Sequence, residues 1–295
     1  MSCSNVTPDL YVRRARKGLR LLVVLTITLS GSNVAQAFAA SSAQESATAP
    51  QQAPSALDRN SILRAVLWMR TSGEYEALCQ QIFNAALAQI RQDLKTRQQG
   101  KPPAIIMDLD ETVLDNGAYT VYLLTAGSRH SSDQWRSWNR NNIHKISLVP
   151  GAKEFIKAVE KENVHVAFIS NRSESIRDIT TDILVNHDLG RKQELLDRGT
   201  LRLLLREKTG SKEVRRREVR AKYDVIALLG DNLGDFSDDF RSPAVKSIDE
   251  RRSAVKKHMD QWGARWFVLP NPIYGYWTRF IDWNQAHTHF ESPRH

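Results

Sequence analysis

The chain contains 295 residues, of which 41% are hydrophobic and 25% are charged, a composition typical of a globular protein. This length is enough for one large domain or two small ones with a real apolar core. The formal net charge of +9 suits anionic small molecules and does not call for a nucleic acid polymer, because the basic residues of 202–222 are interspersed with glutamates.

The first 39 residues have the three parts of a secretory signal peptide. Five basic residues between Arg13 and Arg20 precede an apolar stretch at 21–29, and small residues suitable for cleavage follow at 35–39. The apolar stretch is about half of the roughly 20 residues that a membrane-spanning helix needs, so we expect cleavage rather than the alternative, an uncleaved anchor. Residues 1–37 hold five basic residues and one acidic residue, so the net charge falls from +9 to about +5 in the mature chain.

Residues 40–56 are rich in Ala, Ser, Gln, Thr and Pro without apolar periodicity, which indicates a flexible leader. Cys3 leaves with the signal peptide, so the second cysteine, Cys79, has no partner for an internal disulfide. The cleavage region contains no cysteine that could carry a lipid. We therefore expect a periplasmic or secreted protein with no stable membrane anchor.

Residues 57–99 are predicted to form an N-terminal helical segment, because Leu78, Ile82 and Ala86 share one helical face before Gly100 to Pro103 break the chain. Beyond the break, short apolar runs alternate with helical stretches. Such runs are typical of strands buried on both faces of a parallel sheet, so we expect a doubly wound α/β fold. The expected strands are 104–107, 164–169, 201–205, 225–229 and 266–269, and the expected helices are 152–162, 175–186, 211–222 and 248–261.

Residues 117–149 interrupt this alternation. They contain Trp135, Trp138 and many polar residues, and the segment is too long for an ordinary connection. We expect a small cap over one end of the sheet.

The sequence Ile105-Ile106-Met107-Asp108-Leu109-Asp110 ends an apolar strand in two aspartates one residue apart. Alternate residues of a strand point the same way, so both carboxylates can face one site at its tip. Two close carboxylates repel each other unless a cation or a shared proton relieves them. Such a pair suits a reaction in which one is an ionised nucleophile and the other transfers protons.

Two further groups of polar residues follow strands. Asp231 and Asp235 come after the run at 225–229 and add two carboxylates at the same end of the sheet. Oxygen ligands without Cys or His favour Mg²⁺ over zinc. Ser170 and Asn171 follow the run at 164–169, and their hydroxyl and amide groups suit phosphoryl oxygens.

The sequence does not fix the roles of one arginine and two lysines near these groups. We assign Arg172, which follows Ser170 and Asn171, to the rim of the site or to structure. Lys208 and Lys212 are the two candidates for a fixed positive charge at the site.

These motifs, in this order, resemble the phosphotransferases of the haloacid dehalogenase (HAD) superfamily. The paired aspartates resemble those of the DDDD phosphohydrolases, and the chain is similar to the class C bacterial acid phosphatases, which include the lipoprotein-e 5′-nucleotidases. The stretches Trp68–Tyr75, Val149–Ala152 and Leu269–Gly275 resemble further signatures of that family, so the match extends from about 60 to 280. The resemblance implies a HAD-type domain over 57–295 with a helical cap.

The resemblance also implies a mechanism in which Asp108 attacks phosphorus and Asp110 acts as general acid and base. Mg²⁺ would be bound by Asp108, the backbone carbonyl of Asp110 and Asp231, with Asp235 orienting these ligands. Ser170 and a lysine, preferably Lys208 with Lys212 as competitor, would bind phosphoryl oxygens. The list of catalytic candidates is Asp108, Asp110, Ser170 and Lys208.

Two features depart from the family. The chain lacks the lipobox cysteine of the lipoprotein-e type, and Gly234-Asp235 stands where an acidic pair is usual.

For the leaving group we expect nucleoside 5′-monophosphates beside aryl phosphates. Asn171 would contact the substrate, and Trp138 and Tyr274 would stack on a nucleobase. Two alternatives remain, another HAD phosphohydrolase such as a sugar phosphatase, and a non-enzymatic exported binding protein on the same fold. Turnover of a phosphomonoester with magnesium separates them.

Overall fold

A computed structural model describes residues 56–290. The predicted signal peptide (1–39) and nearly all of the predicted leader (40–56) lie outside these residues; the first helix begins at Ala56. In the described part of the chain, no helix combines the length and the hydrophobicity needed to cross a membrane.

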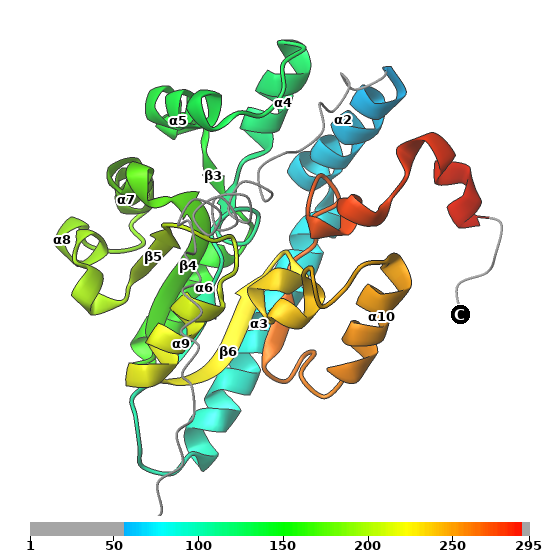
Figure 1. Ribbon diagram of the computed structural model, residues 1–295. Helices are drawn as coiled ribbons and strands as arrows, with labels where there is room; N and C mark the ends of the chain where they lie inside the picture. The colour runs from blue at the N-terminus through cyan, green and yellow to red at the C-terminus, as the bar shows by residue number, and fades with distance from the viewer. Residues whose placement is uncertain (1–55, 291–295) are drawn as a thin grey trace, which may run out of the picture. The chain divides into compact units, whose positions relative to one another are not determined.

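The core of the described residues is a five-stranded sheet in which neighbouring strands are parallel, in the order β5-β4-β1-β6-β7 (Figure 1). Each of the five predicted apolar runs supplies one strand, so the predicted doubly wound α/β fold is confirmed. The strands are β1 (Pro103–Met107), β4 (His165–Ser173), β5 (Leu203–Arg206), β6 (Asp224–Gly230) and β7 (Trp266–Val268).

The central strand β1 shows how both faces of the sheet are buried. Ile105 and Met107 pack into the larger hydrophobic cluster, with side chains of α3 (Gly73–Thr96) and α6 (Ala152–Lys161). Ala104 and Ile106 point the other way, into a smaller cluster that includes Val219 of α9 (Glu213–Lys222). A strand enclosed on both faces therefore reads as an unbroken apolar run.

The N-terminal helical segment is divided into two helices by Ser72. α2 (Ala56–Thr71) ends just before this residue, and the Ser72 hydroxyl then accepts a hydrogen bond from the backbone N–H of Tyr75 at 3.1 Å, which caps the start of α3. The inner face of α3 buries Tyr75, Cys79 and Phe83 against the sheet. Full burial of the Phe83 side chain stabilises the fold by roughly 1.5–3 kcal/mol.

The insertion predicted at 117–149 contains two helices, α4 (Gly117–Thr125) and α5 (Ser132–Asn141). Its ends meet in a short antiparallel ribbon, β2 (Leu114–Asp115) with β3 (Ser147–Leu148). Both helices lie beyond the carboxyl end of the sheet (Figure 1). The insertion thus lies over the end of β1, which Asp108 directly follows.

The remaining elements connect and cover the strands. The further α-helices are α7 (Arg177–Asn186), α8 (Lys192–Leu196), α9 (Glu213–Lys222) and α10 (Ile248–Lys257). Short 3-10 helices are η1 (Ile143–Lys145), η2 (Glu174–Ile176), η3 (Arg198–Thr200), η4 (Leu233–Asp235), η5 (Asp238–Phe240), η6 (Tyr276–Phe280) and η7 (Trp283–Phe290).

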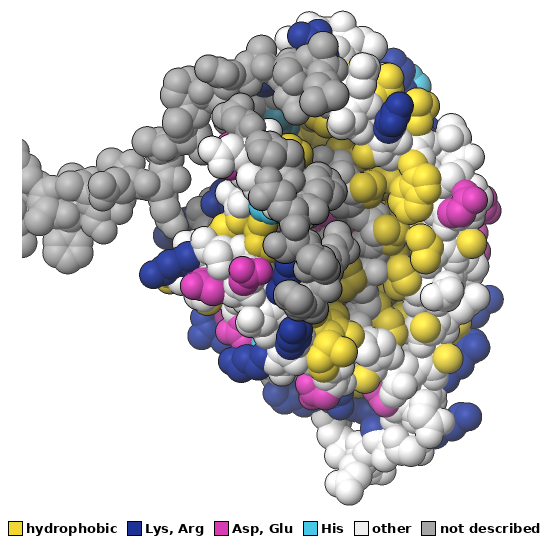
Figure 2. Space-filling view, turned by 90° about the vertical axis from the view of Figure 1, so that its right-hand side faces the viewer, with side chains coloured by type: hydrophobic (Ala, Val, Ile, Leu, Met, Phe, Trp, Pro, Cys, Tyr) yellow, Lys and Arg dark blue, Asp and Glu magenta, His cyan; other side chains and the backbone are white. Residues whose placement is uncertain are grey.

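One side of the molecule carries a band of hydrophobic side chains, with Lys and Arg spaced along its lower edge between Asp and Glu (Figure 2). Acidic side chains stand between the basic ones along this edge.

Candidate active site

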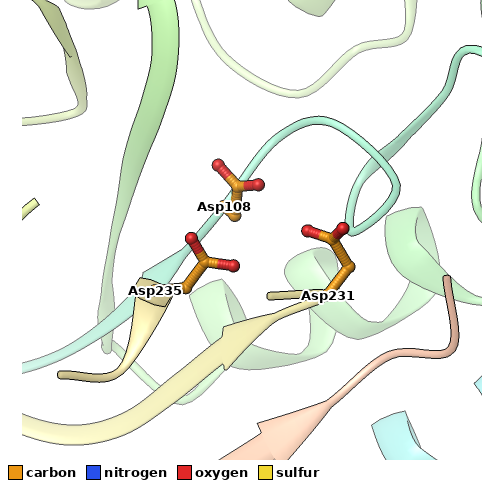
Figure 3. A group of neighbouring side chains, drawn as sticks. All are labelled: Asp108, Asp231 and Asp235. Atoms are coloured by element: carbon orange, nitrogen blue, oxygen red, sulfur yellow. The ribbon is translucent and has the colours of Figure 1, made fainter. Parts of the chain in front are cut away.

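Three carboxylates meet where β1 and β6 end. Asp108 directly follows β1, Asp231 directly follows β6, and Asp235 closes η4. Oxygens of all three lie within 4.8 Å of one another (Figure 3). The backbone N–H of Asp108 still donates to Leu229 of β6 at 3.0 Å, so the ladder between the two strands holds the cluster together.

Backbone and amide donors orient two of these carboxylates. Asp235 Oδ2 accepts the backbone N–H of Asn232 at 2.9 Å, and Asp231 Oδ2 accepts Asn271 Nδ2 at 2.8 Å. Gly230 makes room for Asp235, because a Cβ at position 230 would lie 2.5 Å from Asp235 Oδ2. The carboxylates are therefore fixed in place before any ligand binds.

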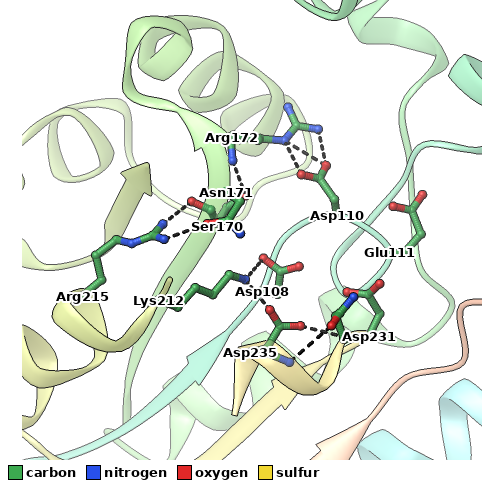
Figure 4. A network of polar contacts seen from close by, with 12 residues as sticks. Asp108, Asp110, Glu111, Ser170, Asn171, Arg172, Lys212, Arg215, Asp231 and Asp235 are labelled. Carbon is green, nitrogen blue, oxygen red and sulfur yellow. Dashed lines mark hydrogen bonds and ion pairs between the residues drawn. The ribbon is translucent and has the colours of Figure 1, made fainter. Parts of the chain in front are cut away.

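The lysine at the site is Lys212. Its side chain is only 4% exposed, and its ammonium group donates to Oδ1 of Asp108 and lies 2.8 Å from Oδ1 of Asp235 (Figure 4). Lys208 is exposed and lines a separate, smaller pocket. This corrects the preference for Lys208. The loop after β5 is exposed at Lys208 and becomes buried only at its last residue, Lys212, where α9 begins.

Burial and mutual repulsion oppose ionisation of the carboxylates in this cluster. Burial raises the pKa of Asp108 to about 7, opposed by Lys212 and reinforced by repulsion from Asp235 and Asp110. Burial followed by repulsion from Asp235 and Asp108 raises the pKa of Asp231 well above its ordinary range. Burial alone would lower the pKa of Lys212, but Asp108 and Asp235 together raise it.

The cluster therefore fits a divalent metal ion. Three ionised carboxylates and one ammonium group carry a net charge of −2, which one divalent cation neutralises. The ligand atoms are all carboxylate oxygens, the type that Mg²⁺ and similar hard cations prefer. The carboxylate of Asp110 is not part of this cluster.

Asp110 points instead toward Arg172 (Figure 4). Asp110 Oδ1 accepts Arg172 Nη2 at 2.7 Å, Arg172 Nε at 2.9 Å and Asn116 Nδ2 at 2.8 Å. Among the described residues, Asp110 Oδ2 accepts a hydrogen bond only from Arg172 Nε, at 3.2 Å. Arg172 is buried and also donates to Oδ1 of Asn139, so of the two expected positions, rim or structural, the geometry excludes the rim.

Ser170 and Asn171 are inside β4, which extends beyond its predicted end to Ser173. Ser170 is fully buried, its hydroxyl accepts the N–H of Arg172 at 3.1 Å, and its side chain does not line the active-site cavity. Asn171 does line the cavity. Its amide is fixed at both ends, by Gly210 at 3.0 Å and by Arg215 Nη2 at 2.7 Å.

A cavity of about 930 Å³ opens over the carboxylates, large enough for a phosphate ester with a sizeable leaving group. Trp135 and Tyr119 of the cap line it, with ring centroids 4.7 Å apart. Trp138 is 5% exposed and stacks behind Trp135 at 6.5 Å, outside the lining. The residue on the cavity wall is therefore Trp135, which corrects the expectation for Trp138.

Tyr274 also lines the cavity and is 42% exposed. Its hydroxyl donates to Oε2 of Glu111, a fully buried residue with φ of 57°. Burial, followed by repulsion from Asp110 and Asp231, raises the pKa of Glu111 well above its ordinary range. Sequence reasoning assigned no role to Glu111, which directly follows Asp110, or to Asn271, which stands inside the stretch Leu269–Gly275.

Comparisons with known proteins agree with this geometry. The model of the HAD superfamily, subfamily IIIB (acid phosphatase), matches residues 25–277. The structure of the class C acid phosphatase from Bacillus anthracis is 30% identical, covers 81% of this chain and 92% of its own, and superposes with a TM-score of 0.66. A structure of that enzyme with tungstate bound is also 30% identical, with 81% and 98% covered and a TM-score of 0.68.

Proposed function

Since the chain belongs to the class C acid phosphatases of the HAD superfamily, which hydrolyse phosphoric monoesters, we propose that it works through an aspartyl-phosphate on Asp108 with Mg²⁺ as cofactor. The observation that carries this proposal is the meeting of Asp108, Asp231 and Asp235 around Lys212 at the ends of β1 and β6. A relative that binds tungstate, a tetrahedral oxyanion like phosphate, supports it.

In the first step Asp108 attacks phosphorus while the bond to the leaving oxygen breaks. The carboxylate of Asp108 is held by Lys212 and by the end of β1, so it need not reorganise to reach the phosphoryl group. The same ammonium group would contact a phosphoryl oxygen and offset the repulsion between the two anions. Asn171, fixed by Gly210 and Arg215, would face the substrate.

Asp110 would give its proton to the leaving alcohol and then take one from the water that hydrolyses the intermediate. Oδ1 of Asp110 is saturated by three short contacts, from Arg172 and Asn116. Oδ2 receives one longer contact and is the oxygen free to carry the proton. Arg172 would thus decide which oxygen of Asp110 faces the leaving group.

The metal would be held by Asp108, Asp231 and Asp235, which the charge of the cluster favours. When bound, Mg²⁺ supplies electrostatic stabilisation of the phosphoryl oxygens. Asn271 fixes one oxygen of Asp231 and leaves the other directed to the cluster.

For the substrate class we propose nucleoside 5′-monophosphates. The flat ring of Trp135, backed by Trp138 and flanked by Tyr119, forms an aromatic wall on which a nucleobase of any kind can stack. Tyr274 also lines the cavity and offers a second ring. Sugar phosphates are the competing class and would make little use of this wall.

We further propose export, with residues 1–39 removed as a signal peptide. The basic, apolar and small-residue segments of 13–39 support this. The test is N-terminal sequencing of the protein from periplasmic and culture-medium fractions. A mature N-terminus near residue 40 agrees with the proposal, and an intact Met1 in the membrane fraction contradicts it.

The first experiment measures phosphate release from 5′-AMP, an aryl phosphate and glucose 6-phosphate at mildly acidic pH, with Mg²⁺ or a chelator. The protein is compared with Asp108→Asn and with Asp224→Asn, an exposed carboxylate at the opposite end of β6. We expect metal-dependent release, fastest from 5′-AMP, lost in the first variant and kept in the second. A folded, metal-loaded protein that hydrolyses no ester would support the binding-protein alternative instead.

A further inference from the structure

Beyond the catalytic carboxylates, the wall of the cavity carries positive charge without a matching negative one. The two cations at the catalytic centre each bind a carboxylate. Four other arginines line the cavity, and none forms an ion pair with another described residue. No described acidic side chain lines the cavity outside the catalytic centre. The four arginines are Arg136, Arg206, Arg241 and Arg279.

Arg241 packs against two glycines of the loops that carry the site. A Cβ placed on Gly234 would lie 3.2 Å from both Cδ and Nη1 of Arg241, and one placed on Gly210 would lie 3.2 Å from Nη2. The guanidinium group therefore occupies the gap between the loops that follow β5 and β6. Gly234 is the neighbour of Asp235, so this arginine is adjacent to the carboxylate cluster. Because residue 234 has no side chain, nothing there neutralises the charge of Arg241.

A second guanidinium group shares the ring of Tyr276 with Arg241. The Cζ of Arg241 lies 5.3 Å from the ring centroid, and the Cζ of Arg279 lies 4.8 Å from it. Arg251 approaches the same ring at 5.4 Å but is buried and donates to the carbonyl of Phe240. Burial, followed by attraction to Tyr276 and repulsion from Arg241, leaves the pKa of Arg251 lowered. Three like charges around one ring favour the binding of an anion.

We propose that Arg241 and Arg279, positioned by Tyr276, form a subsite for a second phosphate group on the leaving group. This inference rests on the proposed function, since it concerns the substrate of the same cavity. A guanidinium group offers two parallel N–H donors that match two phosphate oxygens, and it binds phosphate more specifically than an ammonium group does. The preferred substrates would then be bisphosphates that lose one phosphate at Asp108.

The experiment compares substrates that differ only in the second phosphate. The pairs are 5′-AMP with adenosine 3′,5′-bisphosphate, and glucose 6-phosphate with glucose 1,6-bisphosphate. The quantity measured is kcat/KM for release of the first phosphate, expressed as the ratio of bisphosphate to monophosphate. For the wild type we expect a ratio of about ten or more in at least one pair.

The variants separate the subsite from the catalytic centre. Arg241→Ala should lower the ratio about tenfold. Arg241→Lys should give an intermediate ratio, because lysine keeps the charge but lacks the two parallel N–H donors of the guanidinium group. Gly234→Asp should lower the ratio like Arg241→Ala, since it places a carboxylate beside an intact arginine. Arg217→Ala, which removes an exposed arginine of α9 outside the cavity, should leave the ratio at the wild-type value.

A wild-type ratio near one in both pairs would contradict the proposed subsite. An Arg241→Ala variant in which kcat/KM falls equally for the bisphosphate and the monophosphate would contradict it too. A ratio that falls in Arg206→Ala and not in Arg241→Ala would overturn the assignment to Arg241. Failure of the proposed function has a different signature, because the wild type would then release no phosphate even from the monophosphates.

Discussion

The two halves of the cavity differ in how their charges are neutralised. At the strand ends, Lys212 and Arg172 bind carboxylates at 2.7–2.9 Å or closer, and all of these groups except Asp110 are largely buried. On the outer wall, Arg241 and Arg279 meet no carboxylate of the described chain. Burying an unpaired charge is costly, so the inner half must carry its own counter-charges, whereas the half-exposed outer wall can leave that role to a ligand.

This contrast indicates that the inner half carries out the reaction and that the outer half selects the substrate. The inner half rests on the ends of β1 and β6, which the sheet holds in register. The outer half rests on the cap, on the loop after η5 that carries Arg241, and on the segment 271–280, which the sheet does not hold in register in this way. Changes to the inner half should therefore affect every substrate alike, and changes to the outer half should affect substrates differently.

The largest effect should come from removing the metal. A chelator should abolish activity and also lower the melting temperature, by about 5 °C relative to protein with Mg²⁺ at about 100 times its Kd, because a ligand at that concentration stabilises by about 2.7 kcal/mol. Differential scanning fluorimetry with and without Mg²⁺ measures the shift.

Asp231→Asn provides the control for this experiment. It removes one charge from the crowded cluster, so the metal-free variant should melt above the metal-free wild type and gain little from Mg²⁺. An identical Mg²⁺ shift in both proteins would show that the cluster is not the binding site.

The second effect distinguishes the two lysines. Lys212→Ala should lower kcat by about 10²–10³, the cost of losing one group that stabilises transition-state charge. Lys208→Ala should remain within about twofold of the wild type, because Lys208 is exposed and outside the cavity. Steady-state kinetics on an aryl phosphate measures both. A larger loss of kcat in Lys208→Ala than in Lys212→Ala would identify Lys208 as the catalytic lysine and refute the assignment made from geometry.

The difference between these lysines illustrates how far the sequence alone reaches. The five strands could be predicted because each is an apolar run buried on both faces, and Asp108, Asp231 and Asp235 could be grouped because parallel strands end at one edge. The path of the loop between β5 and α9 has no such periodicity. Which of its lysines turns inward depends on where the loop becomes buried, and that is a property of the packed structure.

The contact between Arg172 and Asp110 was missed for a related reason. It lies two residues after Ser170, and alternate residues of a strand share a face, but β4 was predicted to end before it. Had the strand been extended to Ser173, the pattern would have directed Arg172 to the same edge of the sheet as Asp110. Polar residues at a strand end conceal how far the strand continues, since they lack the apolar pattern.

The third effect concerns this arginine. Arg172→Lys should lower kcat by about 10–100-fold with little change in KM, because an ammonium group cannot bind Oδ1 of Asp110 through two donors. It should also alter the pH profile of kcat, which a purely structural role would not do. Arg177→Lys, which disturbs a comparable pair with Glu174 away from the cavity, should keep both the rate and the profile. An equal loss of kcat in the two variants would show that Arg172 has only a structural role.

The smallest effect tests the outer half within the cap. Trp135 and Trp138 are three residues apart on α5, so the helical period directs both to one side, and only packing against Tyr119 decides which ring meets the cavity. Trp135→Ala should raise KM for 5′-AMP about tenfold and leave glucose 6-phosphate nearly unchanged, because loss of one stacked ring costs about 1–3 kcal/mol per base. Trp138→Ala should instead lower the free energy of unfolding by about 3–5 kcal/mol, as a buried tryptophan does. Kinetics with both substrates and urea unfolding give the two readouts. If Trp138→Ala, rather than Trp135→Ala, discriminates between the substrates, the base lies deeper in the cap than the cavity wall implies.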